Sequence, residues 1–309
     1  PVVGYGGRTV NTLRLWSAKA TEEFSLDDFN RGSYVSAVES KVHSENLTKV
    51  LYPSDNVFQG KELRLKQEYF FVSCSIQDIL RRFKADGNPW SAFPDKVFVQ
   101  LNDTHPALLV PELMRLLIDR EGLHWDEAWE ITTKSTGYTN HTILPEALEK
   151  WPLSMIENLL PRHLLILFEI NARFMRDVAI RYPLDTDRLR RMSIFEDGGE
   201  KNVRMAHLAI VGSCSVNGVA ALHTHLLKER VLRDFAEYWP EKFNNKTNGI
   251  TPRRWLLKAN PPLAELITRS IGDGWITDLE QLRKLEPLAE NAAFRKKFRA
   301  AKQQNKAAL

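Results

Sequence analysis

Three short polar segments carry residue types suited to binding a neutral, polar ligand. They are NDTHP (102–106), TNHT (139–142) and NKTNG (245–249). Their Asn, Asp, His and Thr side chains donate and accept hydrogen bonds with short, fixed geometry. A hydroxyl-rich ligand such as a sugar suits this set, whereas a phosphate would call for Gly-rich loops with Lys or Arg. The segments therefore predict a sugar-like or polar small-molecule site.

Each of these residues, taken alone, has a second interpretation. Asp103 could cap the helix that follows it, because Asp is a strong N-cap residue. His105 and His141 could each be a buried histidine with its hydrogen bonds satisfied. His223 and His225 lie two apart on an expected helix and so face different sides, which argues against a metal site there. The residues alone do not decide between these interpretations.

The segments follow or precede elements that would bring them together. The apolar run VFVQL (97–101) is of strand length and leads through NDTHP into a helix expected from about Pro106. The same order recurs at 131–150, where a β-rich stretch leads through TNHT into a helix led by Pro145. Ligands of open α/β sheets bind beyond the carboxyl ends of the strands. The expected class is therefore α/β, with the polar segments at one edge of the sheet.

Helical periodicity dominates the rest of the chain. Further helices are expected at 34–50, 61–84, 155–182 and 207–238, the last interrupted at Asn217 and Gly218, and in the tail beyond Glu290. Pro252 is expected in the first turn of the helix that follows NKTNG. Val35, Val38 and Val42 form a narrow apolar stripe on the helix 34–50, which suits contact with another helix.

Composition excludes several classes of protein. The 309 residues are 43% hydrophobic and 27% charged, as in an ordinary globular protein. No apolar run approaches the ~20 residues that cross a bilayer, so no membrane span is expected. The net charge is +4, and the tail alone contributes six positive residues. The sequence does not combine basic residues with base-reading residues on one face, so it does not indicate nucleic-acid binding. Cys74 and Cys214 fit no paired pattern, which favours buried thiols and a cytoplasmic location.

A longer set of motifs resembles one family nearly end to end. In chain order these are NVFQGKELRLKQEYFFV, QLNDTHPALLVPELMR, TNHTILPEALEKWP, LRRMS, MAHLAIVGS, SVNGVA and NKTNGITPRRWL. Together they resemble the α-glucan phosphorylases, the glycogen, starch and maltodextrin phosphorylase family. The resemblance implies a two-domain glycosyltransferase of the GT-B type. Residues 1–252 would belong to the N-terminal domain, and residues 253–309 would be the first helices of a truncated C-terminal domain.

The resemblance also implies a reaction and a set of substrate contacts. The family transfers a terminal glucosyl unit from an α-1,4-glucan reversibly to orthophosphate, which gives glucose 1-phosphate. Six positions match its substrate-binding residues: His141 and Asn248 at the 6-hydroxyl of the reacting glucose, Asp103 and His105 on the acceptor-sugar side, and Asp55 and Asn56 in a mobile loop that gates the site.

The family's cofactor is pyridoxal phosphate, whose phosphate relays a proton to the substrate phosphate. Trp255 resembles the residue that packs beside this cofactor. The cofactor lysine of the family pattern falls beyond Leu309, and its cofactor-facing glycine-rich loop falls before Pro1. We therefore expect no catalytic residue and no metal ligand in this chain, and no turnover by the chain alone.

Regulatory and assembly features of the family match less completely. Arg81 and Arg82 resemble a nucleotide-phosphate site of allosteric members, and an exposed basic helix end is the alternative interpretation. Val57 stands where animal members carry an aromatic residue, which argues against their purine-type inhibitor stack. The helix 34–50 matches the family's tower helix and indicates a homodimer.

One further surface of the family is partly matched. Phe168 replaces a tyrosine of the glycogen-storage surface of animal members, whereas Asn171, Asp197 and Lys201 are compatible with that surface.

Two rival functions stay open from the sequence. The first is a non-catalytic glucan-binding or scaffold protein that keeps the phosphorylase-like half as a platform. The second is a nucleotide-sugar glycosyltransferase of the same architecture, which the tryptophan segment PRRW makes less favoured.

Overall fold

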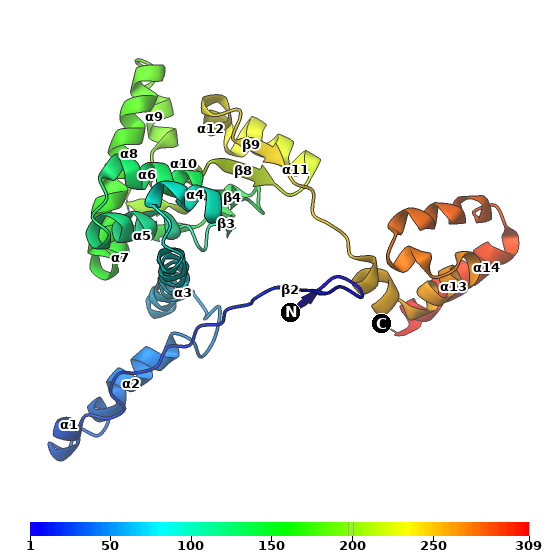
Figure 1. Cartoon of the computed structure of the whole chain (residues 1–309), viewed down its shortest axis with the longest axis horizontal. Coiled ribbons are helices and arrows are strands. Elements are labelled where there is room, and N and C mark those ends of the chain that lie inside the picture. Colours follow the sequence, from blue (N-terminus) through cyan, green and yellow to red (C-terminus); the bar gives the residue numbers. More distant parts are fainter. Residues whose placement is uncertain (197, 200, 309) are drawn as a thin grey trace. The chain divides into compact units, whose positions relative to one another are not determined.

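The computed structural model describes residues 1–196, 198–199 and 201–308. The chain divides into two compact units, a larger one of Leu15–Thr247 and a smaller one that joins Pro1–Arg14 to Asn248–Leu309. Their elements are labelled as in Figure 1. None of the described helices is both long enough and apolar enough to span a bilayer.

The larger unit contains, in chain order, α1 (Leu26–Asn30), α2 (Ser36–Asn46), α3 (Phe58–Ala85), η1 (Trp90–Ala92), α4 (Phe93–Lys96), β3 (Val99–Asn102), α5 (Leu109–Arg115), η2 (Leu116–Arg120), α6 (Trp125–Lys134), β4 (Thr136–Thr139), η3 (Pro145–Ala147), β5 (Lys150–Pro152), α7 (Leu153–Leu159), α8 (Pro161–Arg181), α9 (Thr186–Met192), β6 (Phe195–Glu196), β7 (Asn202–Arg204), α10 (Met205–Val211), β8 (Ser215–Gly218), α11 (Ala221–Leu226), η4 (Leu227–Val231), α12 (Arg233–Tyr238) and β9 (Phe243–Asn245). The smaller unit contains β1 (Val2–Val3), β2 (Thr9–Val10), η5 (Arg253–Lys258), α13 (Pro261–Ile271), η6 (Gly274–Ile276), η7 (Leu279–Leu288) and α14 (Ala292–Ala308).

A parallel sheet in the order β3-β4-β8-β9 forms the centre of the larger unit. One row of facing residues crosses all four strands: Leu101, Tyr138, Val216 and Phe243. All four are buried, so this row anchors the sheet to the helical core. The α/β class and the shared carboxyl edge expected from the sequence are confirmed.

Helix α5 is almost entirely buried beside this sheet. Its residues from Leu109 to Met114 are all buried, and it packs against α3, α6 and α8. Figure 1 shows these helices gathered beside β3 and β4. The helix 61–84 expected from the sequence is α3, which begins earlier, at Phe58, and buries Ile76, Leu80 and Phe83 as predicted.

A carboxylate inside α5 ties three helices together. The side chain of Glu112 is fully buried, and its oxygens accept hydrogen bonds from Ser73 of α3 at 2.8 Å and from Arg115 at 2.8 and 3.0 Å. His163 Nε2 of α8 lies 2.7 Å from the second carboxylate oxygen. Burial opposes ionisation of Glu112, but these partners outweigh it and lower its pKa to about 2.

The prediction of a helix after Pro145 is wrong. The segment forms only the single 3₁₀ turn η3 and then enters β5, which pairs antiparallel with β7. Trp151 faces Val203 across this pair, and both are buried. Burial of Trp151 in a second sheet, ordered β5-β7-β6, overrides the helical pattern.

Two other expected helices are also broken. The helix expected at 155–182 divides into α7 and α8 at Leu160, because the following Pro161 disfavours helical backbone at the residue before it. The helix expected at 207–238 contains β8, a central strand, at the supposed interruption. Val216 is the one branched apolar residue of that strand, so its sequence signal is weak.

The smaller unit has its own apolar cluster. Ala264, Ile267 and Trp275 form its buried centre. Asn260 caps α13 by accepting a hydrogen bond from the Leu263 N–H at 3.3 Å, and it also accepts one from Asn305 of α14 at 2.7 Å. The tail helix expected from the sequence is α14, and the helix after Pro252 is η5.

Replacing Glu112 with alanine should destabilise the protein by about 3–5 kcal/mol, because removing one partner leaves the half-buried Arg115 and the buried His163 uncompensated. Urea unfolding followed by tryptophan fluorescence measures this change. Glu169→Ala is the matched control: it removes an exposed carboxylate that pairs with Arg173 at 2.7 Å, and it should cost less than about 1 kcal/mol. Equal, small effects of the two substitutions would show that the buried network contributes nothing.

Candidate functional site

A chain of polar side chains crosses the sheet near its carboxyl edge. Gln100 Nε2 of β3 donates to Thr139 Oγ1 of β4 at 2.9 Å, and this hydroxyl donates to Asn217 Oδ1 of β8 at 2.9 Å. Asn217 Nδ2 donates in turn to its neighbour's carbonyl, Gly218 O, at 2.9 Å. These residues lie one position away from the buried apolar row, so their side chains point to the opposite face of the sheet. The edge is thus polar and fixed in place.

The turn after β4 is held from inside the protein. The buried Asn140 donates from Nδ2 to Tyr138 Oη at 3.0 Å, and its Oδ1 accepts from the Thr142 N–H at 3.0 Å. This arrangement leaves His141 exposed, with Nε2 2.7 Å from Asn102 Oδ1 at the end of β3. His141 is therefore not a satisfied core histidine, and it lies beside the NDTHP segment as the sequence predicts.

Asp103 is not a helix cap. Helix α5 begins at Leu109 after the N-cap residue Leu108, five residues beyond Asp103. Asp103 instead adopts a left-handed backbone with φ 68°, and its Oδ1 accepts from the Thr104 N–H at 2.7 Å. Such a conformation is uncommon for a residue other than glycine and turns the chain sharply at the end of β3.

The carboxyl end of β8 contains contacts that the sequence did not indicate. A Cβ on Gly218 would lie 2.4 Å from Thr224 Oγ1 and 2.7 Å from His223 Nδ1, so only glycine lets α11 approach this closely. His223 Nδ1 accepts from the Val219 N–H at 3.1 Å, and Thr224 Oγ1 donates to Asn245 Oδ1 of β9 at 2.9 Å. These contacts link α11 to the start of the third polar segment.

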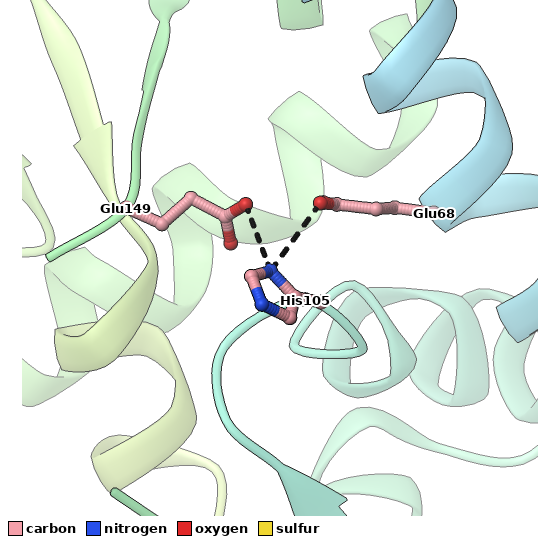
Figure 2. Close-up of side chains that lie close together, drawn as sticks. All are labelled: Glu68, His105 and Glu149. Atoms are coloured by element: carbon pink, nitrogen blue, oxygen red, sulfur yellow. Dashed lines mark hydrogen bonds and ion pairs between the residues drawn. The ribbon is translucent and has the colours of Figure 1, made fainter. Parts of the chain in front are cut away.

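His105 belongs to a charged cluster beside this edge. Its Nδ1 lies 3.3 Å from Glu149 Oε1, 3.7 Å from Glu68 Oε1 and 3.3 Å from Arg64 Nη2. Figure 2 shows the two carboxylates meeting at the same ring nitrogen, Glu68 from α3 on the right and Glu149 from the segment before β5 on the left. Thr104 Oγ1 donates to the other oxygen of Glu149 at 2.9 Å. The sequence indicated His105 but none of its charged partners.

Burial and hydrogen bonding shift the pKa values of the three groups of this cluster in different ways. Burial raises the pKa of Glu68 to about 8. The hydrogen bond to Glu149, together with the nearby Glu68 carboxyl, raises the pKa of His105 to about 10. Burial also opposes ionisation of Glu149, but the hydrogen bond from His105, the adjacent Glu68 carboxyl and the hydrogen bond from Thr104 outweigh it and hold the pKa of Glu149 below its ordinary value. At neutral pH the cluster therefore holds a protonated Glu68, an imidazolium and a carboxylate.

The cluster resembles a metal site in composition but not in charge. The ligand atoms of Glu68, His105 and Glu149 lie within 4.8 Å of one another. Arg64 already supplies a cation there, because its Nε lies 3.5 Å from Glu68 Oε1 and its Nη2 lies 3.3 Å from His105 Nδ1. A metal ion would meet repulsion from this guanidinium, so the geometry favours an ion-pair cluster.

A cavity of about 450 Å³ adjoins the cluster. Asp55, Lys61, His105 and Glu149 are among its lining residues, so the structure brings Asp55 and His105 of the predicted set to one cavity. Asn56 is exposed on the same loop, next to Asp55. The loop passes close to the first turn of α3, where a Cβ on Gly60 would lie 1.8 Å from Ser54 O.

The remaining predicted residues belong to the smaller unit or have local partners. Asn248 and Trp255 belong to the smaller unit. Arg81 and Arg82 both pair with Asp78 of the same helix, at 2.8 and 3.1 Å. These pairs occur on the exposed end of α3.

The residues compared with a storage surface show mixed surroundings. Phe168 stacks on Phe195 with ring centroids 4.7 Å apart. Asn171 Oδ1 accepts from the Ile194 N–H at 2.8 Å, which gives it a structural role. Lys201 is exposed, and Asp197 lies outside the described residues.

The protons of the Glu68 cluster should make stability depend on pH. The ordinary pKa of Glu68 is 4.5, so between pH 4.5 and 8 the folded chain keeps a proton that the unfolded chain has lost. His105 contributes the same sign, because its stabilisation is complete below pH 6.5 and is lost as the pH rises towards 10. Stability should therefore fall from pH 6.5 to 8, a window above that of the half-buried His207, whose pKa is lowered to about 4.

Glu68→Gln should flatten this slope by about one proton, since one of the two shifted groups is removed. Urea midpoints measured across pH 6.5–8 test the effect. Glu130→Gln, which changes an exposed carboxylate of α6, should leave the slope as in the parent chain. A slope unaltered by Glu68→Gln would contradict the proton assignment.

Comparison with known proteins identifies the family. The family model described as carbohydrate phosphorylase matches residues 1–309. The brain form of glycogen phosphorylase from Rattus norvegicus is 57% identical over 99% of this chain and 38% of its own length. The muscle form from Bos taurus is 56% identical over 99% of this chain and 37% of its own length. The chain thus spans less than two fifths of the length of these relatives, and it belongs to the carbohydrate phosphorylase family.

Proposed function

We propose that this chain is part of an α-1,4-glucan phosphorylase, which transfers terminal glucosyl units of a glucan reversibly to orthophosphate. The observation that carries the proposal is His141 at the carboxyl edge of the parallel sheet. A buried Asn140 fixes its turn, and its imidazole meets Asn102 of the neighbouring strand at 2.7 Å. The named relatives in the family are glycogen phosphorylases, which supports a glucan as the ligand.

His141 and Asn248 are proposed to bind the 6-hydroxyl of the reacting glucose. An imidazole nitrogen and an amide can both bond one hydroxyl, as donor or as acceptor. The existing contact of His141 with Asn102 orients the ring, so little side-chain freedom is lost when the sugar binds.

Asp103 and His105 are proposed on the acceptor-sugar side, and Asp55 and Asn56 in the loop that gates the site. The shared cavity of Asp55 and His105 supports this assignment. With His105 protonated, the cavity wall presents a cation next to the Glu149 carboxylate, and both groups hydrogen-bond well to hydroxyls. Asp103 is assigned no acid role, because its carboxylate is committed to the Thr104 N–H.

The cofactor is proposed to be pyridoxal phosphate, whose phosphate group supplies proton transfer to the substrate phosphate when bound. Trp255 is the residue of this chain assigned to pack beside it. Its side chain is 65% exposed within the structure, so the ring face is available to a planar group. The residues of this chain would bind and orient the glucosyl unit, which is how protein groups contribute most in cofactor enzymes.

The larger architecture follows the same proposal. Residues 1–252 are assigned to the N-terminal domain of a GT-B glycosyltransferase, and residues 253–309 to the first helices of its C-terminal domain. The whole protein is proposed to be cytoplasmic and allosteric, with Arg81 and Arg82 near a nucleotide-phosphate site. Their pairing with Asp78 leaves the end of α3 basic, which is compatible with that role.

A homodimer through α2 is proposed for the whole protein. Val35, the N-cap of this helix, is 81% exposed, and Val38 and Val42 are 40% and 48% exposed, so the described residues cover this apolar stripe only in part. A second copy of the same helix would bury it.

His141→Ala should lower kcat/KM for phosphorolysis by about 10–100-fold, which corresponds to the loss of one or two hydrogen bonds to the glucosyl unit. The assay is release of glucose 1-phosphate from maltoheptaose and phosphate by protein expressed from the complete reading frame. His124→Ala, at an exposed histidine before α6, is the matched control and should leave the rate unchanged. Glucan binding without any glucose 1-phosphate would favour the non-catalytic scaffold.

Val38→Asp with Val42→Asp should convert the proposed dimer to monomer, because two buried carboxylates per helix would oppose each other across the contact. Sedimentation equilibrium measures the mass. Ile180→Asp, at a 73% exposed site on α8, should leave the dimer intact. A monomeric parent protein at micromolar concentration would exclude the proposed assembly.

A further inference from the structure

A second cavity lies at the opposite, amino edge of the parallel sheet. It measures about 360 Å³, and its lining includes Thr133, Ser213 and Lys242. These residues precede β4, β8 and β9, whereas the glucan-binding positions follow β3 and β4. Strands of four residues separate the two edges by about 13 Å, so the cavity is distinct from the site described above.

Lys242 is the amine of this cavity. Its Nζ lies 3.7 Å from the centroid of the Trp239 ring and donates to Ile210 O at 3.3 Å. Among the described residues, no carboxylate comes within ion-pair distance of Lys242. An ammonium group in this setting is held by an aromatic face and one carbonyl, which compensate poorly for lost hydration.

The backbone prevents Lys242 from leaving this setting. Its N–H donates to Trp239 O at 3.1 Å, and its carbonyl accepts from the Val216 N–H of β8 at 2.8 Å. Both contacts fix the residue at the start of β9. From this position the side chain lies along the cavity wall, where Nζ contacts the Trp239 ring and Ile210 O.

The surrounding charged groups do not return the pKa of Lys242 to its ordinary value. Burial lowers the pKa of Lys242 to about 8, with small opposing contributions from Cys214 and Glu241. Arg173 and Asp177 of α8 also line the cavity. Arg173 is engaged with Asp126 and Glu169 at 2.7 Å each, and Asp177 lies 3.5 Å from Arg176. At pH 7 about a tenth of Lys242 is thus an uncharged amine.

We propose that Lys242 is a covalent modification site that forms an imine with small aldehydes entering this cavity. The amine lone pair attacks the carbonyl carbon, the N–C bond forms, and the carbonyl oxygen leaves as water after taking up the two amine protons. No oxidant or reductant is needed. The lining includes the aromatic side chains of Trp125, Trp129 and Phe174, which offer apolar surface to the carbon substituent of a small aldehyde.

The matched comparison is Lys134, another lysine on the same side of the sheet. It is exposed and pairs with Glu130 at 2.6 Å, which raises its pKa above the ordinary value. At pH 7 a lysine of pKa about 8 has roughly 300 times more neutral amine than one of pKa about 10.5. Access and intrinsic nucleophilicity reduce the advantage, so we expect Lys242 to react at least about tenfold faster.

Reductive methylation measures this difference in the unmodified chain. Limiting formaldehyde forms the imine, cyanoborohydride reduces it by hydride transfer, and peptide mass spectrometry quantifies each lysine. The Lys242 rate should level off above about pH 8, whereas the Lys134 rate should keep rising. In 8 M urea the two rates should become equal, and Lys242→Arg should abolish the fast label.

Equal rates for Lys242 and Lys134 in the folded chain would overturn the proposal. So would a fast Lys242 label that persists in urea, because the reactivity would then come from local sequence and not from the cavity.

Discussion

The buried Glu112 carboxylate is the interaction on which the arrangement of the larger unit depends. It accepts hydrogen bonds from α3 and from its own helix α5, and it meets His163 of α8. Helix α3 carries Arg64 and Glu68, and the turn before α5 carries His105. The same carboxylate therefore joins the helices that carry or follow the residues of the charged cluster. A buried charge with all its hydrogen bonds made restricts the positions of the helices more than apolar contacts do. A shift of one helix would leave the carboxylate without a partner in an interior that excludes water.

Strand pairing then decides what lies at the site. In parallel register, Leu101, Tyr138 and Val216 occupy one buried row, and the residues beside them form the polar chain at the carboxyl edge. A slip of one residue would exchange the two sets. One strand register thus determines both which residues enter the core and which residues form the polar edge. This coupling explains why side chains as polar as Thr139 and Asn217 occur in central strands of the protein.

Sequence patterns predicted the elements whose signal is local. The run VFVQL, the helix α3 and the turn at Asn140 follow from periodicity and side-chain chemistry. The strand β8 was missed because SVNG has one branched apolar residue, and its strand conformation comes from pairing on both sides. Pairing with β7 likewise replaced the helix expected after Pro145. Glu68 and Glu149 were missed because their importance arises from meeting His105, across 37 and 44 positions of chain, which periodicity does not report.

Gly218 limits which substitutions this protein can accept during evolution. Its missing side chain lets α11 approach the end of β8, and α11 in turn holds Asn245 through Thr224. Any single-codon change that adds a Cβ must push α11 outward and so shift the third polar segment. Even alanine, the smallest replacement, adds this Cβ, so no substitution at Gly218 avoids the clash. Diversification of ligand preference is therefore expected to proceed through the exposed loop at Asp55 and Asn56, where side chains can change without moving the scaffold.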